Sequence, residues 1–215
     1  MKQGKEVHVV ELSEYILNKQ LDRETSERLK KDLEDLGFII HTGISIKEVY
    51  KDKVVLSNGE EIKTDALIFS VGIRSNLDIV PKEIRTNRAI IVDDSLSTNI
   101  DNIWACGDCV EIDGRTFGLW TASNEMGKIA GSNMTGEDKE YHVKSLFTNL
   151  NLGKIKVYSV GKITNDKVKK EEGNNLKVLF FEEGILVGGI LYGDIKEMGK
   201  LNKAISEGSK KEELI

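Results

Sequence analysis

The stretch Ser97–Glu111, which reads STNIDNIWACGDCVE, constrains the fold of this chain more than any other part of it. Its apolar segment Ile103–Cys106 runs directly into Gly107 and Asp108, as a strand does where it ends against a ligand. A glycine at a strand end lets the backbone approach a ligand closely, because it has no Cβ. An ionised carboxylate beside it accepts strong hydrogen bonds from the hydroxyls of a sugar or polyol. We therefore expect Gly107 and Asp108 to contact a polyhydroxylated cofactor.

The same stretch resembles a flavin-binding motif of a known enzyme superfamily. Thr98 lies ten positions before Asp108, and Trp104 and Ala105 stand just ahead of the Gly-Asp pair. The pattern (Thr, five residues, aromatic-Ala-x-Gly-Asp) is similar to the second FAD motif of the FAD/NAD-dependent pyridine nucleotide-disulfide oxidoreductases. These include glutathione reductase, NADH oxidases, rubredoxin reductases and the flavin domains of nitrite reductases. The resemblance implies that Asp108 holds the ribityl chain of FAD.

Composition excludes several other classes of protein. Of the 215 residues, 39% are hydrophobic and 31% are charged, with a net charge of -5 and acidic and basic residues interleaved. Such a chain has no basic surface for nucleic acid. No apolar run approaches the roughly 18 residues that span a bilayer, and the first residues do not form a signal peptide. We expect a globular cytoplasmic protein with neither nucleic-acid nor membrane partners.

The first part of the chain alternates strand and helix. Residues Glu6–Glu11 predict a short strand, Leu21–Leu36 an amphipathic helix stopped by Gly37, and Phe38–His41 a second strand. A three-stranded antiparallel meander follows, with its tight turn at Ser57–Gly59 and its strands at Ile44–Tyr50, Lys53–Leu56 and Glu61–Lys63. The apolar run Ala66–Val71 is typical of a strand that is covered on both faces.

This order of segments resembles the back part of the NAD domain in the same reductases. Glu11 stands at the end of its strand, where a carboxylate can accept hydrogen bonds from the adenosine ribose of NAD and repel a 2′-phosphate. A solvated strand-end residue is the alternative for Glu11. In the family the region around Gly72 crosses back toward the flavin domain. The resemblance therefore implies that Glu11 binds NADH and that Gly72 lies near the cofactors.

The segment Phe117–Met134 predicts a loop that leads into a helix capped by Thr121 or Ser123. The resemblance implies that this helix start faces the pyrimidine edge of the flavin, where a positive helix end stabilises the charge of the reduced ring. Thr121 and Trp120 are then cofactor contacts. A core tryptophan at a loop-helix junction is the alternative for Trp120.

Cys106 and Cys109 form a C-x-x-C pair. A structural zinc ion normally takes four ligands, and the three histidines lie far away in the sequence, so we expect no metal site. We interpret both sulfurs as buried small hydrophobes. A small dithiol oxidoreductase that uses this pair is the alternative.

The last part of the chain resembles the C-terminal domain of rubredoxin reductases and nitrite reductase flavin subunits. Strands are expected at Ile155–Val160, Leu176–Phe181 and Ile185–Tyr192, with a turn at Glu182–Gly184, and a helix at Ile195–Glu207. The His and Glu pair of the disulfide reductases is lacking, so we assign no catalytic side chain. The resemblance implies electron transfer from NADH through FAD to an iron-sulfur, siroheme, rubredoxin or oxygen acceptor.

Two glycine-rich turns of the family, which bind the pyrophosphates of FAD and NAD, do not occur in this chain. Gly4 is the only glycine before Gly37. The resemblance covers nearly all residues here but about half of a full-length relative. We therefore expect a fragment that starts beyond the NAD turn, with Met1 matching an internal methionine, and that alone is inactive and binds FAD weakly.

These observations predict an α/β protein with three parts. Residues 1–76 form the back of a Rossmann-like NAD domain with a β-meander, residues 77–143 the end of an FAD domain, and residues 144–215 a small α+β domain. The expected function is that of a fragment of a flavoprotein reductase whose intact form uses NADH. A homodimer is a possible assembly of the intact enzyme. A non-catalytic remnant that binds a partner through an exposed sheet edge is the alternative.

Overall fold

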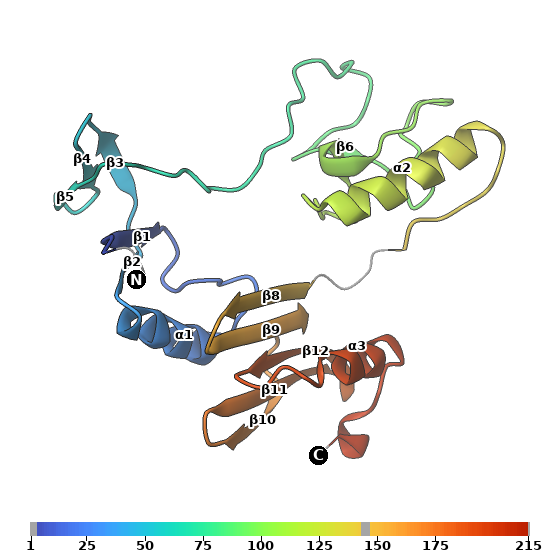
Figure 1. The fold of residues 1–215 in the computed structure, drawn as a ribbon. Helices are drawn as coiled ribbons and strands as arrows, with labels where there is room; N and C mark the ends of the chain where they lie inside the picture. Colours follow the sequence, from blue (N-terminus) through green and yellow to red (C-terminus); the bar gives the residue numbers. More distant parts are fainter. Residues whose placement is uncertain (1–3, 143–146, 215) are drawn as a thin grey trace. The chain divides into compact units, whose positions relative to one another are not determined.

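The computed structural model describes residues 4–142 and 147–214. The expected domain boundary after residue 143 and the match of Met1 to an internal methionine lie outside these residues. The chain divides into two compact units: unit 1 joins Met1–Leu67 with Ser145–Ile215, and unit 2 is Ile68–Lys144. Helices and sheets are mixed along the chain, which confirms the α/β class (Figure 1).

Unit 1 begins with a strand-helix-strand element. Strands β1 (Val7–Glu11) and β2 (Phe38–Thr42) pair in parallel, and α1 (Arg23–Asp35) connects them. The Asp22 carboxylate accepts the Thr25 N–H at 3.2 Å and caps the helix start. At the other end the N–H of Gly37, whose φ is +94°, bonds the Glu34 carbonyl at 2.8 Å. The prediction of this helix and both strands is confirmed.

The expected meander follows as β3 (Ile46–Val49), β4 (Lys53–Leu56) and β5 (Glu61–Lys63), hydrogen-bonded in that order. Gly59 has a φ of +90° and forms the tight turn between β4 and β5. Val54, Leu56 and Ile62 form a small core beneath it.

The C-terminal part of unit 1 is a five-stranded antiparallel sheet in the order β10-β11-β12-β9-β8. Its strands are β8 (Phe147–Leu152), β9 (Ile155–Gly161), β10 (Lys167–Glu172), β11 (Asn175–Glu182) and β12 (Ile185–Tyr192). Glu183 and Gly184, with φ values of 50° and 77°, make a two-residue turn between β11 and β12, inside the predicted turn Glu182–Gly184. The sequence predicts the three inner strands β9, β11 and β12, whereas neither edge strand, β8 or β10, was predicted.

The two faces of this sheet bury different helices. One face shares a core with α1 and β2, to which Leu29, Ile40, Val157, Phe180 and Ile190 belong. The other packs against α3 (Met198–Ser206) through Leu201. Because side chains alternate along a strand, one apolar strand serves both cores. The second half of the chain is thus continuous in its packing with the first strand-helix-strand element.

Polar contacts reinforce the packing of α1 on the sheet. Arg28 donates to Glu171 and to the Asn174 carbonyl, at 2.8 Å each, and its guanidinium lies 4.9 Å from the ring centre of Tyr192. The Tyr192 hydroxyl donates to Asp32 at 2.6 Å. Burial and this bond to a carboxylate raise the pKa of Tyr192 well above its usual value. These contacts orient the helix that connects β1 and β2.

Unit 2 is built around one helix, α2 (Trp120–Met134), and contains little sheet. Strands β6 (Ile90–Ile91) and β7 (Val110–Glu111) form a short parallel pair. The buried residues of α2, Ala122, Met126, Ala130 and Asn133, recur at helical spacing and face a core of loop residues. No helix within the described ranges is long and apolar enough to cross a membrane.

The prediction of a strand is wrong for two apolar segments. Ala66–Val71 adopts no strand structure and is mostly exposed, and Ile103–Cys106 forms only a single bridge, between Trp104 and Ser97. An apolar parallel strand is stable only between neighbouring strands. Such neighbouring strands are not found among the described residues. Both segments therefore have the apolar sequence of a buried strand but do not form one.

Candidate functional site

Gly107 brings the backbone of unit 2 close to the first turn of α2. Its φ of +85° lies in the left-handed region, where a side chain is strained. A Cβ at this position would lie 3.5 Å from the Cβ of Ser123. The Gly107 N–H points at the Met126 sulfur, 3.4 Å away. The backbone conformation therefore favours glycine, while an added Cβ would make only ordinary contact with Ser123; the approach of Gly107 to a ligand stays a prediction.

Asp108 is exposed, and its side chain is nevertheless held in one orientation. Oδ1 accepts a 2.8 Å hydrogen bond from the Ser123 hydroxyl, and the Asp108 carbonyl accepts a 3.0 Å bond from the Ser75 hydroxyl. No salt bridge to Asp108 is found among the described residues. The carboxylate thus keeps acceptor capacity that faces solvent, as a polyol-binding group requires.

The N-cap of helix α2 lies two residues before Thr121 and four before Ser123, the two predicted caps. Leu119 is the N-cap and contributes no side-chain bond, so the expectation that Thr121 or Ser123 caps the helix is wrong. The Ser123 hydroxyl donates a hydrogen bond to Asp108. The backbone N–H of Ser123 donates to the Leu119 carbonyl at 2.9 Å, within the first turn of the helix. The first amides of α2 therefore carry no side-chain cap, which leaves a partly positive helix end near Asp108.

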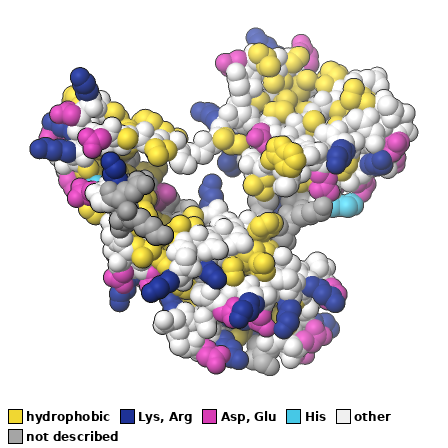
Figure 2. Space-filling view, in the orientation of Figure 1, with side chains coloured by type: hydrophobic (Ala, Val, Ile, Leu, Met, Phe, Trp, Pro, Cys, Tyr) yellow, Lys and Arg dark blue, Asp and Glu magenta, His cyan; other side chains and the backbone are white. Residues whose placement is uncertain are grey.

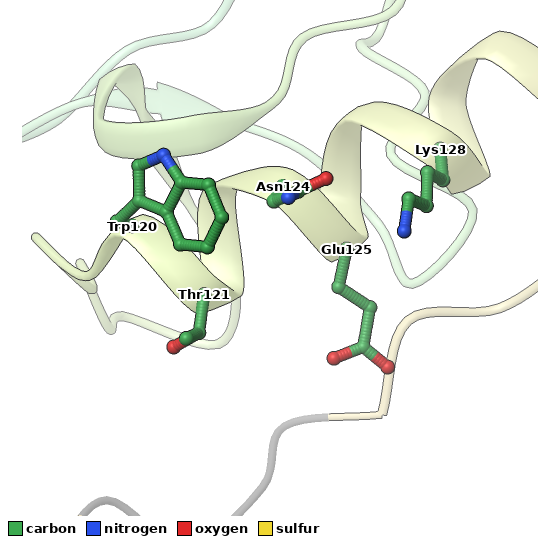
Figure 3. Close-up of a pocket in the computed structure, with 5 residues that line it drawn as sticks. All are labelled: Trp120, Thr121, Asn124, Glu125 and Lys128. Carbon is green, nitrogen blue, oxygen red and sulfur yellow. The ribbon is translucent and has the colours of Figure 1, made fainter.

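Trp120 and Thr121 lie on an exposed face of α2. With Asn124, Glu125 and Lys128 they line an open hollow of about 450 Å³ (Figure 3). Trp120 is 78% exposed, which rules out the core-tryptophan alternative. Figure 3 shows Thr121 and Glu125, one helical turn apart, on the same side of the helix. This face offers an aromatic surface and polar groups to a bound molecule.

The two remaining predicted residues lie elsewhere. Glu11 is the last residue of β1 in unit 1, and its Oε1 accepts the N–H of Ser13 at 2.8 Å. It is partly exposed at the carboxyl end of a parallel strand, which is the edge where α/β folds bind nucleotides. Gly72, with a φ of +87°, lies in unit 2 on the exposed stretch that leads to Ser75. The structure gathers Gly107, Asp108, Trp120 and Thr121 around the start of α2.

The cysteine pair is partly buried and no disulfide joins its two sulfurs. Cys106 and Cys109 are both free, and the Cys109 thiol lies 3.3 Å from the Cys106 carbonyl. Burial, with a contribution from the neighbouring Cys106, raises the pKa of the Cys109 thiol. A redox-active C-x-x-C pair requires a lowered thiol pKa. This environment favours the packing role for both sulfurs over the dithiol oxidoreductase.

Two residues that contact Asp108 were not predicted from the sequence as part of this site. Ser75 and Ser123 hold Asp108 from segments that are distant in the sequence. Ser123 was considered only as a helix cap, and Ser75 carried no signal of its own. A serine near the start of the helix that follows a Gly-Asp pair is the sequence signal that could have indicated this orienting contact.

Known proteins share both parts of this chain. Residues 1–127 match the family described as "Pyridine nucleotide-disulphide oxidoreductase". The chain belongs to this family. Residues 147–209 match the "Rubredoxin NAD+ reductase C-terminal domain". Members of the pyridine nucleotide-disulphide oxidoreductase family bind FAD and NAD(P)H, and the related enzymes are NADH-dependent.

Two relatives indicate the branch of the family. The chain is 34% identical over 197 residues to the NADH-rubredoxin oxidoreductase of Clostridium acetobutylicum, covering 89% of this chain and 50% of that protein. It is 30% identical over 216 residues to the nitrite reductase [NAD(P)H] of Bacillus subtilis, covering 95% and 27%. The chain therefore spans half or less of the length of these relatives.

Solved structures agree in fold. The crystal structure of the C. acetobutylicum NADH:rubredoxin oxidoreductase matches 96% of this chain and 54% of its own, with a TM-score of 0.75 and 30% identity. An NAD-dependent persulfide reductase from A. fulgidus, at 22% identity, shares the fold with a TM-score of 0.85 over 97% of this chain.

The residues around Asp108 fit the FAD of this family. Gly107 has a left-handed backbone conformation that favours glycine, and Asp108 is accessible, with its Oδ1 hydrogen-bonded to Ser123. FAD, when bound, supplies the capacity to accept a hydride. The chain's own contribution at this place is a fixed acceptor for hydroxyl groups and a helix end without a side-chain cap.

Proposed function

We propose that this chain is the second half of an NADH-dependent flavoprotein reductase. The intact protein would transfer electrons from NADH through FAD to a redox partner, of the rubredoxin, nitrite-reductase or oxygen-reducing type. One observation carries the proposal above the others. In a chain of this family, Asp108 stands at the flavin motif with an accessible carboxylate that Ser123 orients.

Each predicted site residue has a role in this proposal. Gly107 and Asp108 bind the ribityl chain of FAD, while Trp120 and Thr121 contact the flavin from the start of α2. Glu11 binds the adenosine ribose of NADH from the carboxyl end of β1, and Gly72 lies on the connection near the cofactors. No side chain is assigned a proton transfer, because hydride and electron transfer need orientation and electrostatics more than an acid or a base.

We further propose that the chain alone does not turn over NADH. It contains neither glycine-rich turn for a pyrophosphate, and it spans half of the C. acetobutylicum relative. Pyrophosphate groups are normally bound by backbone N–H groups at such turns. Asp108 alone would then contact one part of FAD, so the purified chain should show little of the visible absorption of oxidised flavin.

A chimaera tests the proposal. The part of the C. acetobutylicum enzyme that this chain does not match is fused to the 215 residues, and FAD content and NADH oxidation with ferricyanide are measured. The fusion should retain FAD and oxidise NADH. Asp108→Ala should weaken FAD binding about 10-fold or more, as expected for loss of hydrogen bonds to a charged group. Asp138→Ala, a change at another exposed carboxylate of unit 2, is the control.

The competing proposal is a non-catalytic partner-binding remnant. One observation favours it, the exposed apolar segment that follows β5. NADH titration of the chimaera distinguishes the two functions. Saturable binding that weakens on Glu11→Ala supports the reductase, whereas a folded chimaera that binds neither NADH nor FAD supports the remnant.

A further inference from the structure

The loop between β1 and α1, residues 12–21, holds the Glu11 carboxylate in place. The Ser13 N–H donates to Glu11 Oε1 at 2.8 Å, and the Ser13 carbonyl accepts the N–H of Gly43, also at 2.8 Å. The Asn18 side-chain amide donates to the Ser13 hydroxyl at 3.0 Å and so connects the first half of the loop to the second. The loop therefore orients Oε1, and the carboxylate retains acceptor sites for a ligand.

The second half of this loop contains a strained turn. Leu17 has a φ of 51°, in the left-handed region that a leucine rarely adopts. Its carbonyl accepts the N–H groups of Gln20 and Leu21, at 2.8 Å each. A strained conformation of this kind persists only where surrounding contacts hold it. The turn therefore needs support from other parts of unit 1.

The C-terminal sheet supplies that support. The hydroxyl of Ser159, a residue of β9, donates a hydrogen bond to the Gln20 carbonyl, and Ser159 is only 6% exposed. Ile16 and Leu21 belong to the core that this face of the sheet shares with α1. From α1 itself, the Ser26 hydroxyl donates to the Ile16 carbonyl at 2.6 Å. The loop is thus held from one side by its own helix and from the other by β9.

Charged side chains of the same sheet hold the helix and not the loop. Figure 2 shows acidic and basic side chains interspersed over the surface of the C-terminal sheet. Three ion pairs join β10 to α1 and its N-cap: Lys167 with Asp22, Lys169 with Glu24, and Arg28 with Glu171. None of these three pairs includes a residue of the loop. Ser159 therefore has a separate role, and removing its hydroxyl would leave the buried Gln20 carbonyl without this donor.

A continuous series of contacts links the C-terminal sheet to the proposed nucleotide-binding carboxylate. The series runs from the Ser159 hydroxyl through Gln20, Leu17, Asn18 and Ser13 to Glu11. Its two ends lie in parts of the chain that match different family models, residues 147–209 and residues 1–127. The C-terminal part thus contacts the loop that orients Glu11.

We propose that Ser159 is a positioning residue for NADH binding, which keeps the β1-α1 loop closed so that Glu11 meets the adenosine ribose in one orientation. This inference rests on the proposed function, in which Glu11 binds NADH. A loop that is open part of the time lowers the apparent affinity in proportion to the closed fraction that is lost. The adenosine end of NADH does not react, so its contacts affect KM and leave kcat unchanged.

Hydrogen exchange on the full 215-residue chain tests the contact without any cofactor. Ser159→Ala should speed exchange of the loop amides of Ser13, Gln20 and Leu21 about threefold or more, as expected for loss of one buried hydrogen bond. Ser159→Thr keeps the hydroxyl and should restore slow exchange.

Val160→Ala is the matched control. Val160 is the next residue of β9, and its side chain points to the opposite face, into the core that contains α3. This substitution weakens the same sheet without removing a contact to the loop. It should therefore speed the loop amides no more than the amides of β11.

Steady-state kinetics of the chimaera test the role in NADH binding. Ser159→Ala should raise the KM for NADH about threefold to tenfold and change kcat less than about twofold. Val160→Ala should leave the KM unchanged. If Ser159 acts through Glu11, adding Ser159→Ala to Glu11→Ala should raise the KM no further, because the two effects are then coupled.

Three results would overturn the positioning role. These are loop amides that Ser159→Ala leaves unchanged, a KM for NADH that stays at the parent value in an active Ser159→Ala chimaera, and an equal rise in KM with and without Glu11. Failure of the proposed function gives a different result, a folded chimaera that oxidises no NADH. The exchange measurement decides in either case whether Ser159 holds the loop.

Discussion

The Ser123 hydroxyl donates a 2.8 Å hydrogen bond to Oδ1 of Asp108, and so connects the first turn of α2 to the turn that follows Gly107. An exposed carboxylate normally samples several rotamers, and ordering it costs conformational entropy. A bond from a residue of a packed helix reduces that cost before any ligand arrives. Ser123 is therefore a positioning residue for the candidate flavin site.

Ser123→Ala should weaken FAD binding by the chimaera about fivefold, since a single hydrogen bond contributes about 1 kcal/mol net. Ser123→Thr keeps the hydroxyl and should restore most of the affinity. Flavin fluorescence titration measures both. An alanine variant with the affinity of the parent would mean that Asp108 is oriented by other contacts.

Gly107→Ala should lower the free energy of unfolding of unit 2 by roughly 1–2 kcal/mol, because an L-residue is strained at a φ of +85°. Gly127→Ala is the matched control. It lies within α2, where an added Cβ meets no atom within 4 Å, and should stabilise by roughly 0.5–1 kcal/mol. Trp104 and Trp120, the only tryptophans, both lie in unit 2, so urea unfolding followed by tryptophan fluorescence reports on this unit. Equal effects of the two substitutions would contradict the assigned strain.

Elements whose signals are local were predictable from the sequence. Helix α1 has its cap at Asp22 and its stop at Gly37, and the β11-β12 hairpin has its turn at Glu183 and Gly184, all within a few residues of the element. The Gly107-Asp108 pair could likewise be singled out from the sequence, because the conformational freedom of glycine and the charge of aspartate are properties of the residues themselves.

Elements that depend on distant neighbours were not predictable. The apolar run Ala66–Val71 satisfies the pattern of a buried strand, but a strand exists only where other strands pair with it, and the described chain supplies none. The bonds from Ser75 and Ser123 to Asp108 depend on how loops pack on α2, which no local pattern encodes. The two serines that bond to Asp108 were therefore missed as supports of the site, and the contact of Gly107 and Asp108 with FAD stays a prediction.

The cysteines give a prediction about reactivity. Since burial raises the pKa of the Cys109 thiol, its thiolate fraction at neutral pH is small, and alkylation by iodoacetamide should be slower than that of a free cysteine. The rate should increase with pH through a midpoint above the ordinary thiol value. Two free thiols should be counted after denaturation without reductant. Fewer than two, or fast alkylation at neutral pH, would support the dithiol oxidoreductase instead.

Asp22 gives a prediction about the pH dependence of unit 1. Burial raises the pKa of this carboxyl, but its hydrogen bonds from Lys167 and Thr25 outweigh burial, so the pKa is lower in the folded state than its ordinary value. The folded state therefore binds this proton less readily than the unfolded state does. The resulting stability is fully present above the unfolded pKa of about 3.9 and is lost as the pH falls through the folded value.

Two substitutions separate the charge of Asp22 from its capping role. Asp22→Ala removes both the N-cap of α1 and the partner of Lys167, and should cost about 1–2 kcal/mol at pH 7. Asp22→Asn keeps a capping oxygen and removes the charge, so it should cost less at pH 7 and approach the parent in stability as the pH is lowered below about 4. Urea unfolding followed by far-ultraviolet circular dichroism at several pH values measures the difference. A gap between parent and Asp22→Asn that stays constant from neutral to acidic pH would show that the Lys167 contact does not stabilise the charged form.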